Sequence, residues 1–190
     1  MKNIISLLNN SEFAYVRKKI FKKDEIIFKE NEQCNSIGII QEGNIQIISY
    51  SFNGNELLYN SLSTNEIFGI NLIFSNDPFY KGDVIAKENS TIYFIDKNNL
   101  INLLQTNNNF LNEYLKIQSD FGKKLNFTIK MLSYEKAEER FMYFLFSNRN
   151  KITYKSITDL AIILFLLNKM NQNQFELKQI LLQLKVAQLK

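Results

Sequence analysis

The sequence contains no histidine and only one cysteine among its 190 residues. Without histidine, the chain cannot build a His-ligated haem site, the usual zinc sites or a His-dependent catalytic triad. Cys34 alone cannot form an internal disulfide or a four-cysteine iron–sulfur cluster within one chain. We therefore expect no haem, no iron–sulfur cluster and no bound metal. Because the chain also lacks a nucleophile–base pair and a glycine-rich phosphate loop, we do not expect an enzyme.

Long apolar runs are also missing. The longest, residues 160–167, has eight residues, whereas a helix that spans a bilayer needs about 20. Residues 1–10 show neither a long apolar segment nor a small-residue cleavage site of the kind that signal peptides carry. We therefore expect a cytoplasmic protein without a membrane partner.

Acidic residues are scarce at one end of the chain. Residues 151–190 hold six lysines against Asp159 and Glu176, so this segment carries the whole net charge of +4. A basic terminal segment is typical of a nucleic-acid-binding module. A lysine-rich, solvated end of the chain is an equally good explanation of the charge alone.

Glycine is infrequent, but five of the six glycines lie within residues 38–82, where they separate short apolar runs. Such runs between turn residues are typical of a compact all-β roll or barrel. Asn53-Gly54 is a strong hairpin signal, and Gly43 marks a second turn. The runs predict strands at residues 26–28, 37–40, 45–48, 57–59, 84–86 and 92–95. We predict one or two short helices within residues 1–19 and another at residues 96–106.

A repeat of seven residues begins near residue 110. The apolar and neighbouring positions of this repeat predict a helix over residues 110–134 with a coiled-coil seam. An amphipathic helix that lies on its own β-roll would show a similar pattern, but a rod of roughly 35 Å would overhang a small roll, which favours a dimer. The predicted dimerisation residues are Leu111, Tyr114, Leu115, Gln118, Phe121, Leu125, Ile129 and Leu132.

Three segments together resemble the Crp/Fnr family of bacterial transcription regulators. Residues 28–45 resemble the opening strands of that family's β-roll, residues 67–69 and 86–90 resemble the two sides of its effector pocket, and residues 138–145 resemble the connection to its DNA-binding domain. The resemblance covers about residues 10–146. It implies a homodimer paired along the long helix, with an effector-binding roll and a C-terminal helix-turn-helix that binds double-stranded DNA.

The resemblance and the residue patterns together predict an α+β fold. Its parts are an N-terminal antiparallel β-roll (a double-stranded β-helix, similar to a jelly roll), a long dimerisation helix and a small helical C-terminal domain. The predicted boundaries are residues 1–109 for the roll with its flanking helices, 110–134 for the dimerisation helix and 135–190 for a partial winged helix or helix-turn-helix.

The effector pocket implied by the resemblance departs from the cyclic-nucleotide pattern. Ile70 stands where the family's ribose-binding glutamate lies, and residues 76–83 contain no arginine for a cyclic phosphate. We therefore expect an effector other than cyclic AMP or cyclic GMP. An unknown small apolar or aromatic effector and a pocket filled by the chain's own rings both fit the sequence. The predicted effector-binding residues are Phe68, Gly69, Ile70, Asn71, Phe79, Tyr80, Lys81 and Gly82.

The C-terminal segment fits the family's helix-turn-helix only in part. Residues 159–164 fit its first half, but Phe165 stands where a glycine would end the helix, and Gln179 stands where an arginine is usual. The predicted DNA-binding residues, Lys169, Asn173, Gln174, Lys178 and Gln179, can reach bases or phosphates, although they also fit the solvent face of an amphipathic helix. Two functions therefore stay open: a dimeric regulator that binds DNA, and a dimeric sensor or interaction protein that has lost DNA binding. Cys34 fits either a redox-sensitive thiol or an inert small apolar residue.

Overall fold

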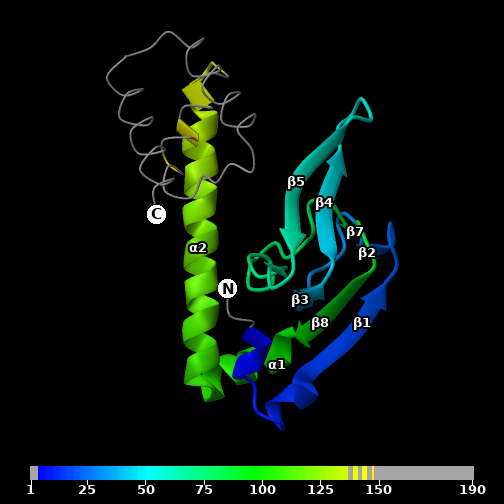
Figure 1. Cartoon of the computed structure of the whole chain (residues 1–190), viewed down its shortest axis with the longest axis vertical. Helices are drawn as coiled ribbons and strands as arrows, with labels where there is room; N and C mark the ends of the chain where they lie inside the picture. Colours follow the sequence, from blue (N-terminus) through cyan, green and yellow to red (C-terminus); the bar gives the residue numbers. More distant parts are fainter. Residues whose placement is uncertain (1–3, 137–138, 141–142, 145–146, 148–190) are drawn as a thin grey trace, which may run out of the picture. The chain divides into compact units, whose positions relative to one another are not determined.

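The computed structural model describes residues 4–136, 139–140, 143–144 and 147. The chain divides into two compact units, Met1–Asp120 and Phe121–Lys190. The first unit contains two four-stranded antiparallel sheets, which are followed by helices (Figure 1). This arrangement agrees with the predicted antiparallel β-roll.

Apart from the β4–β5 hairpin, successive strands alternate between the two sheets along the chain, as in a jelly roll. One sheet has the order β1 (Val16–Phe21), β8 (Ser90–Asp96), β3 (Ser36–Glu42) and β6 (Ile67–Phe68). The other has the order β2 (Ile26–Phe28), β7 (Asp83–Ala86), β4 (Asn44–Tyr50) and β5 (Glu56–Ser63). All six predicted strand segments are present.

Two of the predicted turns depend on glycine. Gly43 has a φ of +104° and carries the chain from β3 in one sheet to β4 in the other. Gly54 has a φ of +76° at the end of the β4–β5 hairpin (Figure 1). Residues with a Cβ rarely adopt such positive φ values, so these glycines fix where the strands reverse.

The N-terminal segment differs from the prediction. Two short 3₁₀ helices, η1 (Ile4–Leu7) and η2 (Glu12–Tyr15), are present, but Val16–Lys19 belong to strand β1 and not to a helix. β1 is an edge strand that pairs only with β8, so its lysines lie in solvent. Charged residues on an edge strand prevent pairing with other chains, and they also hide the strand's apolar alternation in the sequence.

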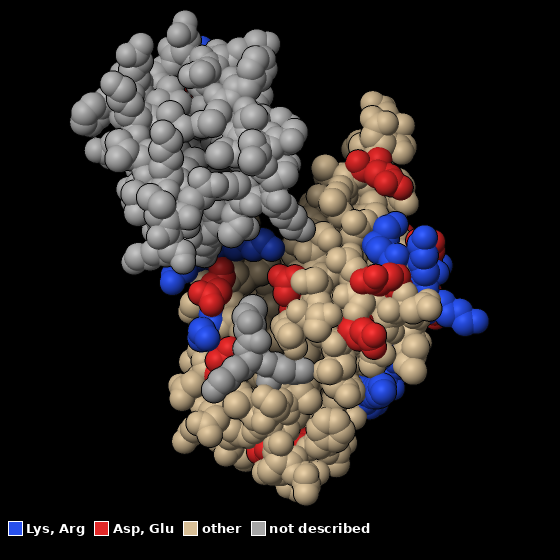
Figure 2. Space-filling model, in the orientation of Figure 1, with Lys and Arg blue, Asp and Glu red and all other residues tan. Residues whose placement is uncertain are grey.

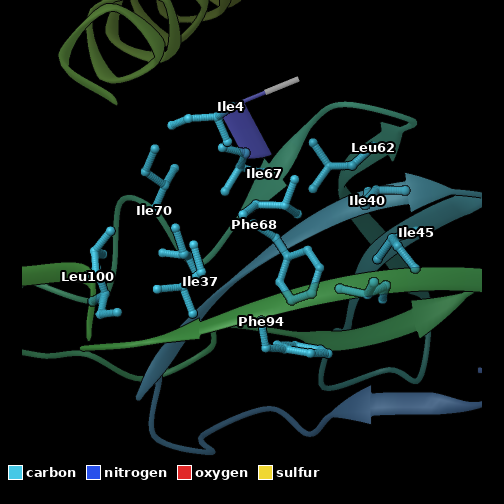
Figure 3. Close-up of a cluster of buried hydrophobic side chains, with 14 of the residues drawn as sticks. Ile4, Ile37, Ile40, Ile45, Leu62, Ile67, Phe68, Ile70, Phe94 and Leu100 are labelled. Carbon is cyan, nitrogen blue, oxygen red and sulfur yellow. The ribbon is translucent and has the colours of Figure 1, made fainter. Parts of the chain in front are cut away.

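The core occupies both faces of the sheet that contains β3, and isoleucine is its most frequent residue (Figure 3). Ile40 on β3 and Ile92 on β8 face the other sheet, whereas Ile37 and Ile39 on β3 and Ile95 on β8 are buried on the opposite face. β-branched side chains pack well on a pleated surface, which explains why isoleucine is so frequent here. Figure 3 shows Phe68 and Phe94 pointing toward each other inside this core.

Two helices follow the last strand. α1 (Lys97–Thr106) buries Leu100 and Leu103, and α2 (Asn108–Leu132) is a continuous helix of 25 residues. The side chain of Asn107 accepts a hydrogen bond from the backbone N–H of Phe110 at 3.0 Å and so caps the start of α2. The observed helix starts and ends two residues before the predicted limits of 110 and 134.

In the second unit, aromatic rings surround the end of α2. Phe127 stacks on Tyr143 with ring centroids 5.3 Å apart, and Tyr143 also contacts Tyr134 at 5.4 Å. Arg140 Nε donates a hydrogen bond to the carbonyl of Tyr134 at 2.7 Å. The predicted DNA-binding residues Lys169, Asn173, Gln174, Lys178 and Gln179 lie outside the described residues.

Candidate effector-binding region of the roll

The predicted effector-binding residues lie on β6 and on the segment that connects β6 to β7. Their side chains fall into two groups. Phe68, Ile70 and Tyr80 are buried, each with 2% or less of its surface exposed. Asn71, Phe79 and Lys81 face solvent. The backbone reverses at Gly69, which has a φ of +77°, and the N–H groups of Leu72 and Ile73 both donate to the carbonyl of Gly69 at 3.0 Å.

The buried rings form a cluster inside the roll. We define the ring cluster as Phe28, Phe68, Tyr80 and Phe94. Phe28 stacks on Tyr80 with centroids 4.8 Å apart, and Phe68 meets Phe94 edge to face at 6.1 Å. Phe28 also contacts both phenylalanines at 6.0 to 6.3 Å. These rings pack as aromatic pairs in a protein core normally do, so they occupy the interior at this point.

A thiol and a phenol meet next to Gly69. A methyl group added at Gly69 would lie 3.0 Å from Cys34 Sγ and 3.2 Å from the Tyr80 hydroxyl. Cys34 Sγ donates to the carbonyls of Ser36 at 3.4 Å and Gly69 at 3.6 Å. The Tyr80 hydroxyl has no hydrogen-bond partner of good geometry among the described residues. Burial raises the pKa of the Cys34 thiol and that of the Tyr80 phenol, so both stay protonated at neutral pH.

The charges of this region do not suit an anionic ligand. Lys81 is the only cation in residues 69–83, and its Nζ lies 2.6 Å from Asp77 Oδ2, with both side chains more than half exposed. Asp83 Oδ1 accepts a hydrogen bond from the backbone N–H of Glu30 at 2.8 Å. Basic and acidic side chains also lie next to one another on the face of the roll drawn in Figure 2. A buried phosphate needs an unpaired, preferably bidentate cation, and this segment provides none.

Tyr80→Phe is expected to stabilise the fold slightly at pH 7. The buried hydroxyl has only the Cys34 thiol beside it, which is a weak hydrogen-bond partner, so its removal relieves a desolvation cost of about 1 kcal/mol. The wild-type protein should lose stability above pH 9, because the unfolded chain releases the protons of Cys34 and Tyr80 near their ordinary pKa values of 9.0 and 10.0 while the folded chain keeps them. Below pH 9 the two groups are protonated in both states, so no stability is lost. Tyr80→Phe should make the loss of stability above pH 9 smaller, because only Cys34 then releases a proton on unfolding.

Urea midpoints at pH 7.0 and pH 10.5, at one protein concentration, measure both effects. Tyr59→Phe is the matched control, because Tyr59 lies on β5 with 55% of its surface exposed. A Tyr80→Phe variant that is less stable than wild type at pH 7 would show that the hydroxyl has a stabilising partner.

Sequence analysis identified Phe68 and Tyr80 but missed Phe28 and Phe94 as members of the same cluster. Both lie inside predicted strands, and Phe94 shares the inward face of β8 with Ile92. The alternation of strand residues could therefore have placed Phe94 in the core. Among the residues that the structure describes, no three His, Cys, Asp or Glu side chains gather in a way that could hold a metal ion.

The ring cluster lies between the two antiparallel sheets of the roll. Residues 18–107 match the family model of the cyclic nucleotide-binding domain. The match covers most of the roll and α1, and it agrees with the observed fold. The comparison with curated proteins gives no significant match.

Solved structures of transcription regulators share this fold. A transcriptional regulator from Thermotoga maritima is 24% identical with a TM-score of 0.59, and the match covers 66% of this chain and 98% of that one. A CooA mutant from Carboxydothermus hydrogenoformans is 20% identical with a TM-score of 0.62, over 78% of this chain and 64% of that one. The catabolite activator protein of Thermus thermophilus is 13% identical with a TM-score of 0.59, over 98% of this chain and 88% of that one.

The predicted dimerisation residues lie along α2 and divide between two faces. Tyr114 is buried against the roll, and Leu111, Gln118 and Phe121 are half-buried. Leu115, Leu125, Ile129 and Leu132 leave 50 to 58% of their surfaces exposed. None of the described helices is long and apolar enough to cross a bilayer.

Proposed function

We propose that this protein is a dimeric, effector-responsive transcription regulator of the Crp/Fnr type, with an effector other than cyclic AMP. The observation that carries the proposal is the exposed apolar face of α2 directly after a domain of the cyclic nucleotide-binding fold. Leu115, Leu125, Ile129 and Leu132 follow the heptad spacing of a coiled coil. A monomer that kept this row of leucines in solvent would gain free energy by pairing.

The proposed regulator would bind operator DNA through its C-terminal segment. The support is the basic balance of residues 151–190 and the resemblance of residues 159–164 and 172–184 to parts of a helix-turn-helix. In such dimers each recognition helix enters the major groove of one half-site. A shift of the paired helices would change the distance between recognition helices and thereby the affinity for DNA.

A mobility-shift experiment with the DNA upstream of the protein's own gene tests this function. We expect binding at 50 mM salt that falls by a factor on the order of 10³ at 200 mM, since six or more phosphate contacts give such a dependence. Lys178→Gln should lower the slope of log K against log salt by about one unit. A scrambled duplex of equal length controls for specificity.

A dimer without affinity for any duplex at 50 mM salt would instead support the second function, a sensor or interaction protein that has lost DNA binding. A monomer at all concentrations would contradict both.

The proposed exclusion of cyclic AMP is tested separately. The support is the paired state of Lys81 and the ring cluster inside the roll. We expect 1 mM cyclic AMP to leave the melting temperature unchanged, because a ligand stabilises only the state that binds it. A concentration-dependent increase in melting temperature would contradict this part of the proposal.

A further inference from the structure

Seven positions of α2 alternate in steps of four and three residues: Leu111, Leu115, Gln118, Gly122, Leu125, Ile129 and Leu132. We call these positions the seam. Such spacing places side chains in one row along a coiled-coil partner. Five of the seven are leucine or isoleucine, and Gln118 is the only polar side chain among them.

Gln118 is hydrogen-bonded to the roll of its own chain. Its Nε2 donates a hydrogen bond to the backbone carbonyl of Ile70 at 2.7 Å, and it lies 3.4 Å from the Tyr114 hydroxyl. The Tyr114 hydroxyl itself donates to the same carbonyl at 3.5 Å, a longer and weaker bond. The strongest contact of this group therefore joins a seam residue to the segment after β6.

The segment bound by Gln118 is the candidate effector region itself. Ile70 follows the turn at Gly69, and its side chain is buried while its carbonyl faces α2. Phe74, five residues beyond the turn, meets the Tyr114 ring edge to face at 6.4 Å. The segment thus touches α2 at Tyr114 and Gln118, one turn apart on the helix.

We propose that Gln118 is a latch that couples the Gly69–Ser75 segment to pairing along the seam, with no ligand required to close it. When the latch is closed, the amide is satisfied by Ile70 and stays out of the apolar seam. When the segment moves away, the amide loses its acceptor. In a monomer the freed amide then meets water. In a dimer its only polar neighbour within the seam would be the partner's Gln118, and a buried polar pair in an otherwise apolar seam lowers the stability of the pairing. Pairing therefore favours the closed latch, and by linkage an effector that opens the latch weakens pairing.

This inference rests on the proposed function, because it needs a dimer formed along α2. Gln118 then acts as a positioning residue, and an effector would have to move the backbone carbonyl of Ile70 away from it.

The first test replaces Gln118 by leucine and follows amide hydrogen exchange in the segment. The N–H groups of Leu72 and Ile73 report on its closure because both are bonded to Gly69. We expect Gln118→Leu to accelerate their exchange by about fivefold, the effect of losing one hydrogen bond, while the dimer becomes tighter because a leucine completes the seam. Asn112→Leu is the matched control, since it removes an exposed amide from α2 at a position outside the seam.

The second test measures coupling with a double-mutant cycle. Leu125→Asp disrupts the seam seven residues from Gln118 and should accelerate exchange at Leu72 and Ile73 by about fivefold or more in the wild-type background. In the Gln118→Leu background the same change should have no further effect on these amides. Equal acceleration in both backgrounds, or none in the first, would overturn the latch.

The two proposals fail in different ways. A wild-type chain that remains monomeric at all concentrations overturns the proposed dimer and the latch with it. If the wild-type chain is a dimer but Leu125→Asp leaves the amide exchange of Leu72 and Ile73 unchanged, the latch alone is overturned.

Discussion

Leu125→Asp should convert the dimer into a monomer at micromolar concentrations. Leu125 occupies the centre of the exposed row on α2, with half of its surface in solvent within one chain. Pairing would bury it in both copies, and the substitution removes two leucines and brings two carboxylates together. The lost burial amounts to roughly 3 kcal/mol, or about a hundredfold in the dimer dissociation constant. Sedimentation velocity over a range of concentrations measures this change.

Asn126→Asp is the control for this experiment. It adds the same charge to the same turn of α2, but residue 126 is exposed and lies outside the seam. The control should therefore remain a dimer, and both variants should keep the far-UV spectrum of the folded roll. If Leu125→Asp and wild type have the same dissociation constant, the dimer forms through another surface and the assignment of the seam is wrong.

The sequence predicted α2 well because a seven-residue repeat indicates a helix whatever that helix packs against. The repeat could not show which side of the helix contacts the roll and which side is exposed. Tyr114 and Gln118 were predicted for the dimer interface, yet both contact Ile70 of their own roll. Side chains three or four residues apart lie on nearly the same face of a helix, so the repeat alone cannot separate the residues that pack on the roll from those that face a partner. The position of the roll against α2 decides which of them are buried. That position depends on long-range contacts, which one sequence does not display.

The strands were predicted from isoleucine runs and glycine turns, and the same reasoning explains the omissions. β1 carries Arg17, Lys18 and Lys19 on an exposed edge, so its apolar alternation is hidden. β6 is only two residues long, too short to show a period. The ring cluster was found in part, because Phe28, Phe68, Tyr80 and Phe94 come from four segments that only the topology brings together.

The close approach of Phe68 to Gly38 connects this topology to function. The two residues are paired across β3 and β6, and Gly38 lies opposite Phe94 on its other side. A methyl group at Gly38 would overlap the Phe68 ring. The ring cannot swing aside freely, because Phe28 and Phe94 lie against it at 6.3 and 6.1 Å.

Gly38→Ala should therefore destabilise the roll by about 1–3 kcal/mol, the usual cost of overpacking a filled core. Urea unfolding at fixed protein concentration measures the loss. Gly122→Ala on α2 is the control for a changed glycine, since no atom lies within 4 Å of a methyl group there and the position has no positive φ. It should not lower the urea midpoint.

Phe68→Leu should relieve much of the cost of Gly38→Ala, because it removes the ring atoms that the new methyl group meets. The double variant is expected to be more stable than the sum of the two single changes predicts, by about 1 kcal/mol. Such coupling would mean that Phe68 occupies the roll's interior in solution. An effector could then enter only by displacing the ring cluster or by acting on the Gly69–Ser75 segment from outside. A neutral Gly38→Ala would instead mean that Phe68 leaves this position, and the interior of the roll would be open to a ligand.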